Sequence, residues 1–414
     1  MTQRGVVIVG AGQAGVQCAV SIRETNAAIP IVLISDEAGD PYHRPQLSKE
    51  FMTATENIAP LELRTRAALS EHGVDFRAPC AVTSINTQRQ TVDIDSGVRL
   101  EYSDLVLATG SRNRSASIPG VELDGVYSLR TLPEASAIRG ALSRAARLVV
   151  VGAGFIGLEL ASAARARGLT VTVIDIAERP MARMLSEQMS QFYLDAHTAD
   201  GIAFRLGDGV DRFEGRNGRV CGVVTSSGEL LAADFVIVAV GIHPNVELAQ
   251  EAGLAVDNGI VVDGSLRTSA SSVWAIGDCA SVPHPLAKNR IRLESVQNAA
   301  DQAEHLGHRL SGADVGNYHA LPWFWSFQGA LRLQIAGLIH DPDEVVIRGD
   351  PQRRRFSAFC FRNEQLQGVE SLNTTPDHMA ARRILAHELA LTPAQAADLD
   401  FDLKTYSRTA GSAA

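Results

Sequence analysis

The sequence predicts an α/β fold with two Rossmann-like domains followed by a C-terminal α+β domain. Three features of the 414-residue chain support this prediction. A glycine-rich turn between a short apolar strand and an apolar helix occurs near the N-terminus, and it recurs in the middle of the chain. In both copies an acidic residue follows the next strand. After about residue 322 the pattern changes to alternating segments that are typical of an antiparallel sheet.

The first glycine-rich turn reads Gly-Ala-Gly-Gln-Ala-Gly over residues 10–15. A strand is predicted at residues 6–9, a helix at 16–22, and a second strand at 31–34 that leads to Asp36. One such turn is weak evidence, because glycine turns are common. Its context of strand, turn, helix and acid is typical of a domain that binds a dinucleotide.

The second copy reads Gly-Ala-Gly-Phe-Ile-Gly over residues 152–157. A strand at 148–151 precedes it, a helix runs to Ala166, and a strand at 171–174 leads to Asp175. In each copy the first glycine allows a sharp turn, the second lets a pyrophosphate approach the backbone, and the third lets helix and strand pack closely. The helix N-terminus favours the phosphate charge, and the acid accepts hydrogen bonds from ribose hydroxyls.

Further apolar strands surround the two copies and define the expected domains. They lie at residues 105–110, 235–241 and 273–278. We predict a discontinuous first domain at 1–111 and 242–322, an inserted second domain at 112–241, and a third domain at 323–414. The third is expected to have an aromatic cluster at 323–327, strands near 331–336, 344–348 and 355–361, and helices at 376–389 and after Thr392.

Composition limits the possible functions. Hydrophobic residues make up 45% of the chain, charged residues 21%, and no apolar run approaches the length of a membrane span. The short run at residues 6–9 does not resemble a signal peptide, so we expect a cytoplasmic protein. The net charge of −9 argues against nucleic acid as the main partner. The five cysteines are scattered and form no C-x-x-C pair, and the eleven histidines show no metal-ligand spacing, so no metal site is predicted.

Two dinucleotide sites in one chain suggest FAD together with NADH or NADPH. We assign FAD to the N-terminal copy, because Gly277 and Asp278 at the end of a strand would place a carboxylate on the ribityl or pyrophosphate region. At the second copy, Asp175 would repel a 2′-phosphate, so NADH is favoured. Arg179 and Arg183 leave NADPH open, since an arginine could accommodate the phosphate.

Five segments together resemble the oxygenase-coupled, NADH-dependent ferredoxin reductases (putidaredoxin reductase-like) of the FAD-dependent pyridine nucleotide-disulfide oxidoreductase superfamily. They are residues 41–49, 152–159, 275–279, 292–299 and 322–326. The resemblance implies a glutathione-reductase-like fold and an enzyme in which NADH gives a hydride to FAD. Electrons then pass singly to an acidic [2Fe–2S] ferredoxin that supplies a cytochrome P450 or a ring-hydroxylating dioxygenase. A monomer or weak homodimer is expected.

The resemblance also implies site residues. Contacts to FAD are expected from Gly10, Gly12, Ala14, Gly15, Asp36, Arg44, Lys49, Val82, Ala108, Thr109, Gly110, Arg130, Gly277, Asp278, Val296 and Trp325. Contacts to NADH are expected from Gly152, Gly154, Phe155, Ile156, Gly157, Glu159, Asp175 and Gly241. Lys49 and Glu159 are the expected catalytic pair.

Each special role has an ordinary alternative. Lys49 can stabilise a reduced, anionic flavin, but it can also be a surface lysine. Glu159 alone would be a solvated helical glutamate. Ser295 can cap a helix that runs to about Leu310, with the Val296 amide facing the flavin, but the helix can also be an ordinary surface helix.

One segment departs from the family pattern. Phe327 and Gly329 stand where the family pattern has an acid and an aromatic residue, which puts local packing and partner contacts in doubt.

Basic residues that could face an acidic ferredoxin form two groups. They are Lys288, Arg290 and Arg292, and Arg353, Arg354 and Arg355.

Rival functions remain open. Disulfide reductases need a cysteine pair and NADH peroxidases need one cysteine, but the stretch Tyr42-His43-Arg44 has none, and Cys279 is better explained as a packed residue. A rubredoxin reductase is possible. So is a non-catalytic, NADH-sensing flavoprotein of the apoptosis-inducing-factor type.

Overall fold

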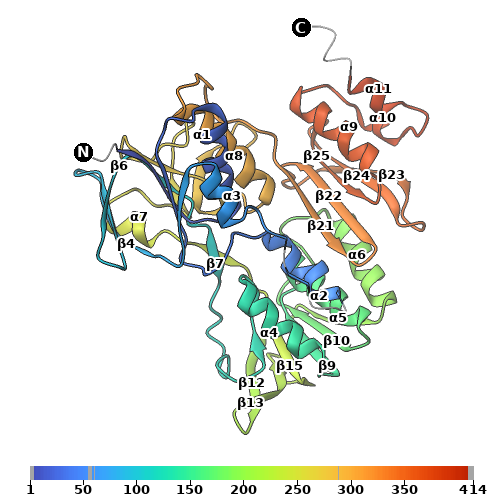
Figure 1. The fold of residues 1–414 in the computed structure, drawn as a ribbon. Helices are drawn as coiled ribbons and strands as arrows, with labels where there is room; N and C mark the ends of the chain where they lie inside the picture. Colours follow the sequence, from blue (N-terminus) through green and yellow to red (C-terminus); the bar gives the residue numbers. More distant parts are fainter. Residues whose placement is uncertain (1–3, 55–57, 60, 288, 409–414) are drawn as a thin grey trace. The chain divides into compact units, whose positions relative to one another are not determined.

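The computed structural model describes residues 4–54, 58–59, 61–287 and 289–408 (Figure 1). The chain forms two compact units. The first contains residues 1–43, 60–112 and 243–322, and the second contains residues 44–59, 113–242 and 323–414. No helix of the described residues has the length and apolarity that a membrane crossing requires.

A seven-stranded sheet forms the centre of the first unit. Its order is β3-β2-β1-β6-β5-β4, and β18 also pairs with β6. The strands are β1 (Gly5–Val9), β2 (Ile31–Ile34), β3 (Val74–Arg77), β4 (Val82–Asn86), β5 (Thr91–Ile94), β6 (Arg99–Leu107) and β18 (Val273–Ala275). The pairs of β1 with β2 and β6, of β2 with β3, and of β6 with β18 are parallel, and all five residues of β1 are buried. A continuous apolar run is what a parallel strand covered on both faces requires.

Two helices of the first unit pack against each other, α1 (Gln13–Thr25) and α8 (Val296–Leu310). Gly307 allows this close approach, because a Cβ at that position would lie 2.5 Å from the Cβ of Ser21. The predicted helix from Ser295 to Leu310 is therefore confirmed, and the Ser295 hydroxyl accepts a hydrogen bond from the Asn298 amide at 3.1 Å.

The second unit contains a parallel sheet in the order β11-β10-β9-β15-β8. The strands are β8 (Val126–Tyr127), β9 (Arg147–Val151), β10 (Thr170–Asp175), β11 (Ile202–Leu206) and β15 (Phe235–Val238). The accompanying helices are α4 (Leu132–Leu142), α5 (Phe155–Ala166) and α6 (Glu187–Ala199). The chain segment η1 (Arg44–Ser48) and α2 (Glu50–Thr53) belongs to this unit and contacts α5. A small antiparallel sheet was not anticipated from the sequence: β12 (Val210–Arg216), β13 (Arg219–Thr225) and β14 (Leu230–Ala232).

The C-terminal part of the second unit is a five-stranded antiparallel sheet in the order β21-β22-β25-β24-β23. Its strands are β21 (Trp323–Gln328), β22 (Leu331–Gly337), β23 (Glu344–Asp350), β24 (Arg355–Arg362) and β25 (Gln365–Leu372). Its helices are α9 (Thr375–Ala386), α10 (Pro393–Ala397) and α11 (Leu403–Tyr406). The predicted aromatic cluster is strand β21, and β25 was not predicted.

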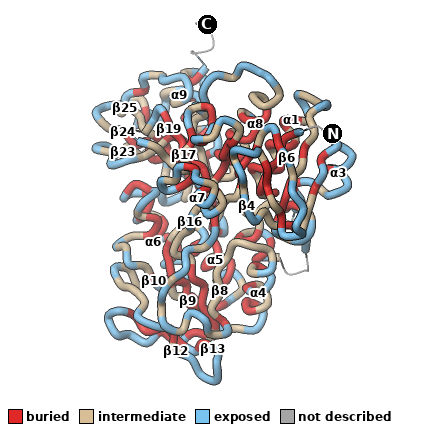
Figure 2. Tube along the Cα trace, turned by 90° about the vertical axis from the view of Figure 1, so that its left-hand side faces the viewer, coloured by how far each residue is buried: buried red, intermediate tan, exposed pale blue. Residues whose placement is uncertain are grey.

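Figure 2 shows that buried residues concentrate in the central strands, whereas the turn between β12 and β13 is exposed. The predicted fold class is confirmed. The division into three domains stays a prediction, since one compact unit contains both the inserted block and the C-terminal sheet.

Candidate functional site

The N-terminal glycine turn has the construction that its sequence predicts. Gly10 has a φ of +104°, and a Cβ there would lie 2.3 Å from the carbonyl oxygen of Ala108. A Cβ on Gly15 would lie 1.8 Å from the Gly10 carbonyl oxygen. A Cβ on Gly12 would meet nothing within 4 Å. Only the middle glycine therefore faces open space, which is where a pyrophosphate would approach.

The second turn repeats this construction. Gly152 has a φ of +109°, and a Cβ there would lie 2.4 Å from the Ala239 carbonyl oxygen. A Cβ on Gly157 would lie 2.1 Å from the Gly152 carbonyl oxygen, whereas one on Gly154 would meet nothing within 4 Å. Neither α1 nor α5 has a side-chain cap or an acid in its first turn. Both helix N-termini thus offer their amides to a phosphate, and the turns fit FAD and NADH.

Other predicted FAD residues gather beside the first turn. The Asp278 carboxylate accepts a hydrogen bond from the Ser111 hydroxyl at 2.8 Å. Gly277 has a φ of +76°, and a Cβ there would lie 3.0 Å from the Cβ of Ala14. These residues lie at the carboxyl ends of β1, β6 and β18, where open parallel sheets bind ligands. The sequence did not indicate Gln302, whose side-chain oxygen accepts a hydrogen bond from the Gly277 amide at 2.8 Å.

Asn245 organises the segment after β6. Its side-chain amide donates to the Thr109 carbonyl oxygen at 2.8 Å, and its backbone amide donates to the Gly110 carbonyl oxygen at 2.9 Å. The Ala108 amide donates to the Val9 carbonyl oxygen at 2.8 Å. The sequence predicted the residues of this segment but not the asparagine that fixes them.

The remaining predicted FAD residues divide between the two units. Asp36 is exposed and Val82 is half-buried in the first unit. Arg44, Lys49, Arg130 and Trp325 belong to the second unit. There Arg44 donates to the Arg130 carbonyl oxygen at 2.8 Å. Their contacts with FAD stay a prediction.

Lys49 and Glu159 form a buried ion pair. The Lys49 Nζ lies 2.8 Å from the Glu159 Oε2, and the side chains are 11% and 2% exposed. The alternative interpretations of Lys49 as a surface lysine and of Glu159 as a solvated helical glutamate are therefore wrong. Two hydroxyls that the sequence did not indicate also donate to the carboxylate: Ser48 to Oε2 at 2.5 Å and Ser326 to Oε1 at 2.7 Å.

A hydrogen-bonded chain continues beyond Ser326. The Gln328 side-chain amide donates to the Ser326 hydroxyl at 3.3 Å, and the Gln328 Oε1 lies 2.6 Å from the His197 Nε2. Burial lowers the pKa of His197, so its ring is neutral and donates from Nε2. The chain links β21 to α6 and restricts the orientation of Glu159.

Phe327 and Gly329, which depart from the family pattern, take no part in this series of hydrogen bonds. Ser326 and Gln328 are buried, whereas Phe327 points to the opposite face of β21 and has the guanidinium of Arg332 5.4 Å from its ring centre. Gly329 has a φ of +59°, and a Cβ there would lie 3.0 Å from the Ser162 hydroxyl oxygen. The substitutions thus leave the Glu159 contacts intact.

The second nucleotide site has an anchored acid. The two Asp175 carboxylate oxygens accept from the Ala153 amide at 2.6 Å and the Ala177 amide at 2.8 Å. Arg179 donates to the carbonyl oxygens of Leu185 at 2.8 Å and Ala182 at 2.9 Å. One of the two arginines that left NADPH open is therefore committed to its own loop.

The other predicted NADH residues lie around this turn. The ring of Phe155 packs 4.6 Å from that of Phe324, and Ile156 is exposed. Gly241 has a φ of +105°, and a Cβ there would lie 3.9 Å from the guanidinium of Arg183. The Arg183 guanidinium thus lies near Gly241, in the segment that follows β15.

The cysteines have no redox arrangement. All five are free, and four of them are buried. The Cys279 thiol donates to the Ile276 carbonyl oxygen at 3.3 Å, and burial raises its pKa, which makes it a packed residue. Within the described parts of the chain, no cluster of His, Cys, Asp and Glu could hold a metal ion.

The prediction that Lys288, Arg290 and Arg292 face an acidic ferredoxin is wrong in part. Arg290 donates to the carbonyl oxygens of Val262 and Ser281, and Arg292 is 9% exposed and paired with Glu294. These guanidinium groups bind the protein itself and cannot form an exposed basic patch. Lys288 lies outside the described residues. The second group includes Arg353, whose side chain is 86% exposed.

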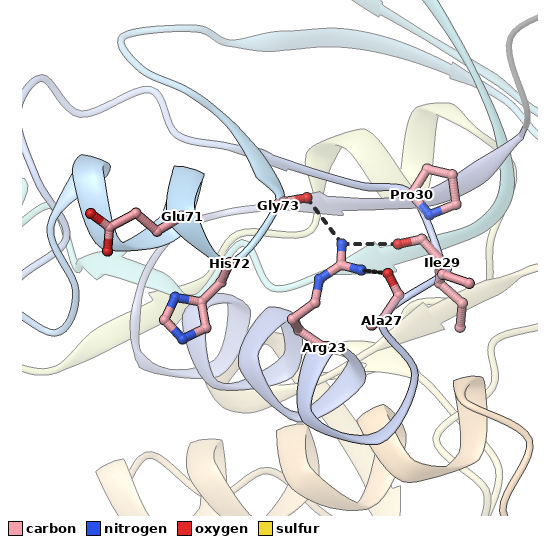
Figure 3. A pocket seen from close by; sticks show the side chains of 8 residues that line it. Arg23, Ala27, Ile29, Pro30, Glu71, His72 and Gly73 are labelled. Carbon is pink, nitrogen blue, oxygen red and sulfur yellow. Dashed lines mark hydrogen bonds between the residues drawn. The ribbon is translucent and has the colours of Figure 1, made fainter.

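A cavity of about 610 Å³ lies in the first unit, at the C-terminal end of α1 (Figure 3). The Arg23 guanidinium points into it and donates to the carbonyl oxygens of Ala27, Ile29 and Gly73. Because these carbonyls occupy the guanidinium, the cavity is explained as local structure rather than as an anion site.

Comparison with known proteins gives two family matches and several close relatives. Residues 4–303 match the pyridine nucleotide-disulphide oxidoreductase family, and residues 323–407 match the reductase C-terminal domain. The chain is 47% identical to rhodocoxin reductase of Rhodococcus erythropolis over 96% of this chain and 93% of the relative. Two crystal structures have TM-scores of 0.95. One is the ferredoxin reductase for the CYP199A2 system of Rhodopseudomonas palustris, with 43% identity over 98% of this chain and 100% of the other chain. The other is the covalent putidaredoxin reductase–putidaredoxin complex, with 35% identity over 100% of both chains.

Proposed function

Because the chain belongs to the pyridine nucleotide-disulphide oxidoreductase family, we propose that it is an FAD-dependent NADH:ferredoxin oxidoreductase. The predicted family and the cofactor pair of FAD and NADH are confirmed. The protein partner is a [2Fe–2S] ferredoxin, which supplies a cytochrome P450 or a ring-hydroxylating dioxygenase. The names of rhodocoxin reductase and of the reductase–putidaredoxin complex support this partner.

The observation that carries the proposal is the buried pair of Lys49 and Glu159. The carboxylate is fixed by two hydroxyl donors, and it holds the ammonium group in one place. A fixed ammonium is a point charge that stabilises the negative charge of a reduced flavin. Ser48 adjoins this lysine, and the described cysteines lie elsewhere, so the arrangement favours transfer to an external protein over disulfide chemistry.

Binding is assigned to the two glycine turns. The turn at 10–15 and the Asp278 region would hold FAD, and the turn at 152–157 with Asp175 would hold NADH. When bound, FAD accepts two electrons together and releases them one at a time. The N-terminus of α8, at Val296, would stabilise negative charge on the bound flavin through its amide groups. Lys49 and Glu159 are the proposed catalytic residues.

A cytoplasmic site of action is part of the proposal. All five cysteines are free, as is usual for proteins of a reducing compartment.

The direct test is anaerobic mixing of the purified protein with NADH and a [2Fe–2S] ferredoxin. Rapid bleaching of the flavin, followed by catalytic reduction of the ferredoxin, is expected. Preferential reduction of a rubredoxin would instead identify a rubredoxin reductase. Slow bleaching with a long-lived charge-transfer complex would identify the sensing flavoprotein.

A further inference from the structure

A second buried carboxylate lies in the same unit as Glu159 and has no place in the proposed chemistry. Glu370 is on β25 of the C-terminal sheet and is fully buried. Its Oε1 accepts from the Ser186 amide at 2.8 Å, and its Oε2 accepts from the Ser186 hydroxyl at 2.5 Å. Ser186 is also the N-cap of α6, since its hydroxyl oxygen accepts from the Met189 amide.

The loop that ends at Ser186 begins at the nucleotide site. It follows Asp175, whose carboxylate accepts from the Ala153 amide of the second glycine turn. The Met181 amide donates to the Ala153 carbonyl oxygen at 2.9 Å, and Met181 has a φ of +53°. Residues 176–186 are thus tied to the glycine turn at one end and to Glu370 at the other.

Stability alone does not explain a carboxylate at this position. Burying the charged form of a carboxyl group is costly, and an apolar side chain of similar volume would pack there at lower cost. Burial raises the pKa of Glu370 to about 7, although hydrogen bonds from Ser186 and the charge of Arg179 oppose the rise. Both protonation states can keep the contact, because the protonated carboxyl can donate to the Ser186 hydroxyl.

We propose that Glu370 is a positioning residue for nicotinamide nucleotide binding. From the C-terminal sheet it holds Ser186, and through Ser186 it holds the 176–186 loop in the conformation that anchors Asp175 beside the second glycine turn. The inference rests on the proposed function only in taking that turn as the NADH site. It gives the C-terminal sheet a part in nucleotide binding.

Three variants of the holoenzyme test this role. Glu370→Met removes both acceptors but keeps an apolar side chain of similar length. Glu370→Gln keeps one acceptor for the Ser186 amide and one donor for its hydroxyl. Ser371→Ala is the matched control, because Ser371 is a buried neighbour on β25 whose hydroxyl accepts from Ser357 and whose side chain points to the opposite face of the sheet from Glu370.

Binding of NAD⁺ to each variant is measured by calorimetry, and the KM for NADH is measured with ferricyanide as acceptor. For E370M we expect the Kd and KM to rise about tenfold with kcat nearly unchanged, because the loop loses both hydrogen bonds to Glu370 and must be ordered when the nucleotide binds. E370Q and S371A are expected to remain near wild type. If E370M does not fold, Glu370→Ala replaces it in the same measurements.

Wild-type affinity in a folded E370M or E370A would overturn the proposal, as would an equal loss in S371A. A loss in E370Q as large as in E370M would also count against it, since the amide can make both contacts. If the wild type binds NAD⁺ but reduces no ferredoxin, the proposed function fails while the role of Glu370 is still tested.

Discussion

The Glu159 carboxylate accepts hydrogen bonds from side chains of two separate chain segments, and Lys49 is its only cation among the described residues, at 2.8 Å. Ser48 and Lys49 come from the segment between β2 and β3, Glu159 from α5, and Ser326 from the C-terminal sheet. A buried carboxylate needs several donors to remain charged. The pair is therefore assembled by tertiary structure and not by one local motif.

Removing one member of the pair should destabilise the protein more than removing both. Lys49→Met leaves the Glu159 charge buried without its cation, which we expect to cost about 3 kcal/mol of unfolding free energy. The double variant K49M/E159M should recover most of this loss, because it leaves no uncompensated charge. Urea unfolding of the single and double variants measures the difference. Additive losses would contradict a buried, coupled pair.

Ser326→Ala should slow reduction of the bound flavin by NADH. The variant removes one of three donors and frees Glu159 to turn, so we expect a rate about tenfold lower. Stopped-flow mixing measures the rate, and Ser357→Ala is the control, because Ser357 is another buried serine of the same sheet without a contact to Glu159. Equal effects of the two substitutions would show that Ser326 acts only through packing.

Asp175 should control the choice between NADH and NADPH. Wild type is expected to prefer NADH, because the carboxylate repels a 2′-phosphate. Asp175→Asn removes the charge but keeps an acceptor for the Ala153 amide, so kcat/KM with NADPH should rise about tenfold. Asp175→Ala loses the anchor as well, and it should lower kcat/KM with both nucleotides. A wild type that uses NADPH at least as well as NADH would refute the assignment.

Glu370 should make stability depend on pH. Its pKa is raised from 4.5 to about 7, so the folded state binds more protons than the unfolded state between these values. The stability of the wild type should therefore fall, relative to Glu370→Gln, as the pH rises through this window. The change should be at most about 3 kcal/mol between about pH 5 and about pH 8, measured by urea unfolding. Parallel pH profiles would mean that the carboxyl group titrates normally.

The sequence predicts those elements whose signals are local. The glycine turns, the strands beside them and the helix from Ser295 to Leu310 follow from spacing, capping and apolar runs. The β12–β14 sheet is mixed in polarity, and β25 follows a turn in which Asn363 and Glu364 both have positive φ, so neither gave a clear pattern.

Long-range polar partners could not be derived in this way. Ser326 and Gln328 alternate along β21, which indicates a shared face but not that Glu159 and His197 lie opposite them. Glu370 appears in the sequence as one glutamate among many. The prediction that Arg292 faces a ferredoxin is wrong for the same reason, because its ion pair with Glu294 and its burial depend on tertiary structure.

The central claim is that this protein transfers electrons from NADH to a [2Fe–2S] ferredoxin, and anaerobic stopped-flow mixing tests it most directly. The FAD-loaded protein, mixed with NADH and oxidised ferredoxin, should reduce the ferredoxin catalytically, and the second-order rate should fall as ionic strength rises. Flavin reduction without any transfer to [2Fe–2S] ferredoxins would contradict the account.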